Sequence, residues 1–144
     1  MSREILFKGK RIFDGEWIEG NVLNIKGEEN PRIATSCLIG EQGEPLIVAA
    51  YEIDPETLCQ YTGLTDKNDK RIWENDIVQH VQRRAQRGVN LRVSWHTFKA
   101  SWVLSKKGWM YNHFFEEGVE PEDVEVIGNF FDNPELLEDS DLTD

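Results

Sequence analysis

Short runs of β-branched and aromatic residues, interrupted by glycine, asparagine or aspartate, recur along this 144-residue chain. The clearest run is 89–95, where every second residue, from Val89 to Trp95, is apolar and the residues between them are polar. This alternation predicts a strand with one buried and one wet face. Similar runs occupy 15–25, 32–39, 45–53, 97–104, 109–115 and 123–131. Many brief strands joined by short connections predict a mainly β, antiparallel fold, a small barrel or sandwich that can divide into two β subdomains.

Helix signals are scarce. Asp54-Pro55-Glu56 and Asn133-Pro134-Glu135 each place a capping side chain before a proline, which is the usual start of a helix. Neither segment has room for more than a turn or two. We therefore expect one or two very short helices.

The segment 64–72 has Asp66, Asn68 and Asp69 between apolar flanks. Such residues hydrogen-bond their own backbone and tolerate left-handed conformations, so the segment predicts a β-turn between two strands. Glu74-Asn75-Asp76 predicts a second turn that opens the next strand.

A hydrophobic content of 39% is enough for one core or for two small subdomains. Cys37 and Cys59 are too far apart in sequence for a metal-type pair, and we expect both to be reduced. The longest nearly uninterrupted apolar run, Pro45–Tyr51, is far shorter than the ~20 residues that cross a bilayer. With only Ile5, Leu6 and Phe7 as an apolar start, no secretory signal is expected. These features predict a cytoplasmic protein without a membrane partner.

The net charge of -11 is distributed unevenly. Residues 1–76 carry -6, residues 77–115 carry +7 without any acidic residue, and residues 116–144 carry -12 without any basic residue. The chain is therefore a charge dipole, and its acidic end has the composition of a solvated tail.

The basic block raises the alternative of nucleic-acid binding, because clustered cations bind phosphates and the aromatic residues between Trp95 and Trp109 offer stacking surfaces. The adjacent acidic tail favours the other interpretation, a solvated face neutralised within the molecule. The candidate residues of the nucleic-acid alternative are Arg83, Arg84, Arg87, Arg92 and Lys99.

No metal site or cofactor is expected. The histidines, His80, His96 and His113, lack the spacing that brings two imidazoles to one metal. No phosphate-binding loop, nucleophile elbow or zinc-protease motif is present in the sequence.

Catalytic residues are not expected either. Cys37 and Cys59 stand among apolar and aromatic neighbours, as core thiols do. The close carboxylate pairs, Asp54 with Glu56 and Asp66 with Asp69, fall where cap and turn chemistry already accounts for them. The sequence therefore predicts a protein that is not an enzyme.

Three segments of the chain resemble the YopX family of phage and prophage proteins. They are Arg3–Arg11, Gln60–Val78, and Val126–Asn129 followed by Asn133–Leu137. The family pattern usually has glycine at the positions of Asp69 and Asn75, and both residues enter the left-handed region at modest cost. The resemblance does not extend to about 25–50 or 79–120. It implies an accessory protein of a phage or prophage and indicates no reaction.

The leading hypothesis is a non-enzymatic YopX-like protein that binds a host or phage protein or associates with itself. The five tryptophans are expected mostly in the core, and an exposed one would be a natural anchor for a partner. We expect an all-β domain over 1–131, with a division near 53–63 as one arrangement, followed by a short helix and acidic tail over 132–144.

Overall fold

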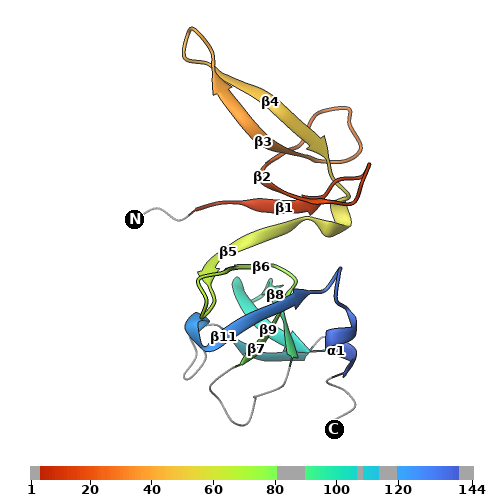
Figure 1. The fold of residues 1–144 in the computed structure, drawn as a ribbon, viewed down its shortest axis with the longest axis vertical. Coiled ribbons are helices and arrows are strands. Elements are labelled where there is room, and N and C mark those ends of the chain that lie inside the picture. Colours follow the sequence, from red (N-terminus) through yellow and green to blue (C-terminus); the bar gives the residue numbers. More distant parts are fainter. Residues whose placement is uncertain (1–3, 81–89, 107–108, 114–119, 140–144) are drawn as a thin grey trace. The chain divides into compact units, whose positions relative to one another are not determined.

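The computed structural model describes residues 4–80, 90–106, 109–113 and 120–139. The chain separates into two compact units, residues 1–61 and 62–144. Each unit is built on antiparallel strands (Figure 1). The prediction of a mainly β, antiparallel fold is therefore confirmed.

The first unit has the strand order β4-β3-β2-β1-β5. Strand β5 begins in this unit and ends in the second. The β1–β2 register is set by the pairs Phe7↔Gly20 and Lys10↔Trp17. The strands are β1 (Phe7–Lys10), β2 (Trp17–Leu23), β3 (Arg32–Ile39), β4 (Pro45–Glu52) and β5 (Cys59–Thr65).

Two glycines of this unit let other residues approach their backbone closely. A Cβ at Gly20 would overlap the carbonyl oxygen of Ala34, and a Cβ at Gly9 would overlap Cγ2 of Ile53. Gly20 lies inside the continuous strand β2. It keeps β2 continuous and lets β3 lie against it, over a core that includes Ile33, Ile53 and Cys59.

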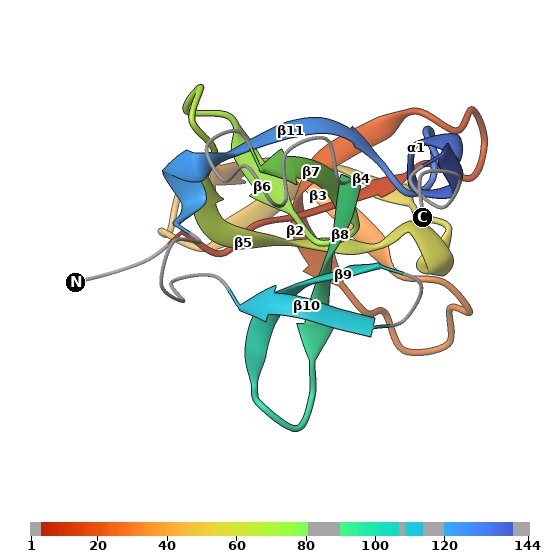
Figure 2. The ribbon, with the colours of Figure 1, turned by 90° about the horizontal axis from the view of Figure 1, so that it is seen from below.

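The second unit contains a five-stranded sheet with the order β10-β9-β8-β7-β11. The β8–β9 hairpin extends beyond its neighbours (Figure 2), since among the described strands Trp95 and His96 pair only with Trp102 and Ser101. Residues 97–100, expected at the start of a strand, form the hairpin turn instead. The elements of this unit are β6 (Arg71–Trp73), β7 (Asp76–His80), β8 (Asn90–His96), β9 (Ser101–Lys106), β10 (Trp109–His113), β11 (Val124–Asn129), the 3₁₀ turn η2 (Pro121–Asp123) and α1 (Glu135–Asp139).

The core of the second unit lies between this sheet and the β5–β6 hairpin. Ile72 of β6 joins a fully buried cluster with residues of β7, β8, β9 and β11, and Leu64 of β5 packs against it. The arrangement is sandwich-like. The other buried members are Val78, Leu91, Val93, Leu104 and Val124.

A short helical segment follows each predicted start, and the expected side-chain cap is seen at Asp54. Asp54 caps the 3₁₀ turn η1 (Pro55–Thr57), where its side chain accepts a hydrogen bond from the Glu56 N–H. At α1 the carbonyl of Asn133 accepts from the Leu136 N–H, while its Oδ1 accepts from the Asn129 N–H.

The turns on either side of β6 are also confirmed. Asp69 and Asn75 both adopt positive φ, 61° and 70°. Asn75 Oδ1 accepts hydrogen bonds from both Nε and Nη2 of Arg92, at 2.9 and 2.7 Å, so this turn is tied to β8.

Because Asp69 is left-handed, glycine should be tolerated there better than any β-branched residue. We expect Asp69→Gly to leave the free energy of unfolding unchanged or raise it by up to about 1 kcal/mol, and Asp69→Val to lower it by at least about 1 kcal/mol. Urea unfolding measures both. A valine variant as stable as the glycine variant would contradict this account of the turn.

Candidate functional site

The loop between β1 and β2, residues 11–16, is an ordered turn in the first unit. The Gly15 N–H donates to the Arg11 carbonyl at 2.8 Å, and the Arg11 N–H donates to the Glu16 carbonyl at 2.9 Å. The Ile12 N–H donates to the Glu52 carbonyl at the end of β4, at 3.0 Å. Gly15 has a φ of 74°, a conformation that favours glycine.

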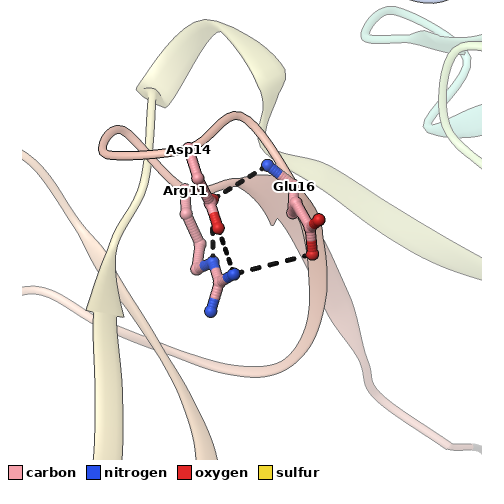
Figure 3. Close-up of polar contacts among 3 residues, drawn as sticks. All are labelled: Arg11, Asp14 and Glu16. Carbon is pink, nitrogen blue, oxygen red and sulfur yellow. Dashed lines mark hydrogen bonds and ion pairs between the residues drawn. The ribbon is translucent and has the colours of Figure 1, made fainter.

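The Arg11 guanidinium is at the centre of this turn (Figure 3). Its Nε donates to Asp14 Oδ1 at 3.0 Å and its Nη2 to Asp14 Oδ2, while Nη2 is 3.6 Å from Glu16 Oε2. Asp14 Oδ1 also accepts from the Glu16 N–H at 3.1 Å. Two acidic side chains thus fix the orientation of one cation.

The same guanidinium contacts two aromatic rings. It lies 4.6 Å from the ring centroid of Phe13 and 5.0 Å from that of Tyr51, and the two centroids are 6.4 Å apart. Phe13 nevertheless remains 72% exposed, and Ile12 beside it is 49% exposed. The turn therefore presents two neighbouring apolar side chains to solvent, and Phe13 is held in place by its contacts.

A pocket of about 420 Å³ adjoins the turn. Its wall combines polar and apolar surface, and Ile12 contributes to it. An exposed aromatic side chain beside such a pocket is a combination that suits a protein partner, because aromatic residues are enriched among the anchors of protein interfaces. The lining residues are Lys10, Arg11, Ile12, Gly15, Asn30, Asp54 and Pro55.

The hydrogen bond from Arg11 lowers the pKa of Asp14 below its ordinary value. The Arg11–Asp14 contact should therefore add stability above the unfolded pKa of about 4 and lose it as the pH falls through the folded pKa. A carboxyl NMR titration should show a depressed midpoint for Asp14. The midpoint should rise in Arg11→Gln, and an equal midpoint in both proteins would contradict the contact.

The candidate nucleic-acid residues do not gather in the described part of the chain. Arg83, Arg84 and Arg87 lie outside the described residues. The Arg92 guanidinium binds Asn75 and lies 3.8 Å from the ring centroid of Phe130, so it is used within the fold. Lys99 is exposed on the β8–β9 turn.

The cysteine and histidine side chains that the structure describes, Cys59 and His96, form hydrogen bonds within the fold. Cys59 is 1% exposed, and its Sγ donates to the Thr57 carbonyl at 3.2 Å. His96 Nδ1 accepts from the Lys99 N–H at 3.2 Å within the turn. The side chains of Cys37, His80 and His113 lie outside the described residues.

Asp66 is 3% exposed, and both of its carboxylate oxygens accept hydrogen bonds from backbone N–H groups. Oδ1 accepts from the N–H groups of Asn68 and Lys70, at 2.8 and 2.9 Å, within the turn. Oδ2 accepts from the Val126 N–H of β11, at 2.9 Å. This carboxylate thus ties the β5–β6 turn to β11.

Within the residues that the structure describes, no group of three or more His, Cys, Asp or Glu side chains is arranged to hold a metal ion. No helix among those residues is long and apolar enough to cross a membrane.

The sequence interpretation did not identify the 11–16 turn as a site. One signal was present, since Ile12-Phe13 are two adjacent apolar residues inside an otherwise polar loop. Their positions, however, are set by contacts with Tyr51 and Glu52, which lie about 40 positions away in sequence.

The fold defines an all-β protein of two small antiparallel units, with an ordered, apolar-tipped turn in the first. The chain belongs to the YopX family: the family model described as YopX protein matches residues 6–138. A crystal structure of protein EF1440 from Enterococcus faecalis is similar, with a TM-score of 0.60, 24% identity, and coverage of 94% of this chain and 99% of that one. At that identity the likeness shows the fold. No curated protein matches the chain.

Proposed function

We propose that this YopX-family protein is a non-enzymatic accessory protein of a phage or prophage that binds another protein in the host cytoplasm through the 11–16 turn. The observation that carries the proposal is Phe13. Its ring is 72% exposed, yet it is held by the Arg11 guanidinium and by Tyr51. A fixed aromatic side chain loses little conformational entropy on binding, which favours its use as an anchor.

The chemistry of the described side chains supports a binding role over a catalytic one. The Cys59 thiol is buried and donates to a backbone carbonyl. The buried carboxylates Asp66 and Asp76 accept hydrogen bonds from backbone N–H groups. Each of these groups is hydrogen-bonded to the backbone and helps to hold the fold together.

The test is affinity capture from nuclease-treated host lysate with three tagged proteins: the native chain, an Ile12→Ser/Phe13→Ser variant, and a Phe98→Ser control. Phe98, in the second unit, is an exposed phenylalanine like Phe13, at 98% against 72%. We expect the native chain and the control to retain the same protein, and the turn variant to lose at least nine tenths of it.

Unfolding curves provide the control for folding, since surface substitutions should leave stability within about 1 kcal/mol. Equal recovery of the partner by a folded turn variant would contradict the proposal.

The second candidate function is nucleic-acid binding by the β8–β9 hairpin. Trp95 is 47% exposed, Phe98 is 98% exposed, and the exposed Lys99 lies in the same turn, which is a combination that stacks on bases and contacts phosphate. This candidate predicts binding that falls steeply with salt and is lost in Phe98→Ser. Nuclease treatment in the capture experiment separates the two functions.

A further inference from the structure

Asp14 and Gly15, within the 11–16 turn, form the only Asp-Gly or Asn-Gly pair in the sequence. A glycine that follows an aspartate has no side chain to hinder the attack of its backbone nitrogen on the aspartate carboxyl carbon. Both residues are exposed, and apart from its chain neighbours nothing lies within 4 Å of the position that a Cβ at Gly15 would take. Sequence and surroundings thus allow a rearrangement of the backbone at this bond.

The rearrangement is the isomerisation of aspartate, and its only co-reactant is water. The Gly15 backbone nitrogen bonds to Asp14 Cγ and loses its proton, and the carboxyl OH leaves with that proton as water. The product is a five-membered succinimide ring. Hydrolysis at the former main-chain carbonyl of Asp14 consumes one water and gives isoaspartate. The main chain then runs through Cβ and Cγ of residue 14, and the former main-chain carbonyl carbon carries the free carboxylate.

The folded turn holds both reacting groups in other contacts (Figure 3). The Gly15 N–H donates to the Arg11 carbonyl at 2.8 Å. Asp14 Oδ1 accepts from Arg11 Nε at 3.0 Å and from the Glu16 N–H at 3.1 Å, and Asp14 Oδ2 accepts from Arg11 Nη2. These contacts must open before Cγ can bond to the nitrogen, and the ones to the guanidinium are charge-assisted.

Arg11 takes part in most of these contacts, because its guanidinium binds the carboxylate and its carbonyl binds the nitrogen. It also acts on the protonation of the carboxyl group, which must carry a proton to lose its OH as water. The hydrogen bond from Arg11 lowers the pKa of Asp14 and so reduces the neutral fraction. The guanidinium itself lies against the rings of Phe13 and Tyr51.

We infer that the Asp14–Gly15 bond is a site of isoaspartate formation and that Arg11 restrains the reaction in the folded protein. Isomerisation lengthens the backbone by one atom and moves the carboxylate to a different carbon. The Arg11 guanidinium then loses its fixed partner, and the Phe13 ring that it contacts loses its support. Modification of residue 14 therefore disables the turn for binding, a consequence that rests on the proposed function.

The test follows isoaspartate in folded protein during prolonged incubation at neutral pH. Electron-transfer fragmentation of proteolytic peptides distinguishes isoaspartate from aspartate at each position. The proteins are the native chain, Arg11→Gln and the matched control Arg32→Gln, which loses another arginine–carboxylate contact of the first unit, that of Arg32 Nε with Glu28 Oε2 at 2.8 Å. At residue 14 we expect Arg11→Gln to isomerise at least about threefold faster than the native chain and the control, because the turn opens more often.

Chains unfolded in guanidinium chloride provide a reference that does not depend on the folding of a variant. Unfolding removes the contacts of the turn, so the native chain should isomerise at residue 14 at least about tenfold faster than when folded. Unfolded native and Arg11→Gln chains should react at the same rate. Equal rates for the folded and unfolded native chain, equal rates for folded native and Arg11→Gln, or isoaspartate mainly at another aspartate of the unfolded chain would each overturn the inference.

These rates are independent of any partner, so they test the inference even when the native chain captures no protein and the proposed function fails. When a partner is captured, the separated isoaspartate form should retain at least about tenfold less of it than the unmodified form. Equal retention by both forms would overturn the consequence drawn for binding.

Discussion

Replacing Asp66 with alanine is expected to lower the free energy of unfolding by about 3–5 kcal/mol, measured by urea denaturation. The substitution leaves three backbone N–H groups, those of Asn68, Lys70 and Val126, without their acceptor at a site that is 3% exposed. Hydrogen bonds to a charged acceptor contribute more than neutral ones, and unsatisfied buried donors are costly. The turn and β11 should both loosen.

Two further variants separate this effect from a general loss of charge. Asp66→Asn keeps one oxygen acceptor and should be less destabilising than Asp66→Ala. Asp69→Gly removes a carboxylate from the same turn at an exposed position, and it should not lower the free energy of unfolding. An Asp66→Ala protein within about 1 kcal/mol of the native one would contradict the role assigned to this carboxylate.

Truncating Ile72 to alanine is expected to lower the free energy of unfolding by about 2–5 kcal/mol. Ile72 is fully buried in β6 and packs in the cluster that joins the β5–β6 hairpin to the five-stranded sheet. The loss combines removed apolar contacts with the cavity left behind.

The matched control is Ile25→Ala, because Ile25 is the same residue type at 43% exposure and should change stability by less than about 1 kcal/mol. Ile72→Val should lower the free energy of unfolding by about 0.5–1.5 kcal/mol, which is less than the loss in Ile72→Ala. Similar losses at both isoleucine positions would show that the β5–β6 hairpin does not form this core.

Local patterns in the sequence predicted much of the fold. The alternation from Val89 to Trp95 predicted β8, where Leu91 and Val93 are fully buried. Turn chemistry predicted the left-handed residues Asp69 and Asn75. These features depend on near neighbours in sequence, so local sequence patterns are enough to predict them.

Long-range contacts could not be predicted in the same way. Asp66 had an adequate local explanation as a turn residue, and its bond to Val126 crosses 60 positions. The role of Gly20 likewise depends on a distant residue, because a Cβ at this position would overlap the carbonyl oxygen of Ala34. The candidate site also depends on a long-range contact, since Phe13 of the 11–16 turn packs against Tyr51 of β4.

The binding role of the 11–16 turn is tested most directly by site-specific photo-cross-linking. p-Benzoylphenylalanine is placed at position 13, or at position 98 as the control, since both native residues are exposed phenylalanines. Each protein is then irradiated in host lysate. The account predicts one discrete, nuclease-resistant protein adduct from position 13 and none from position 98. Adducts with nucleic acid from position 98, together with no protein adduct from position 13, would contradict it.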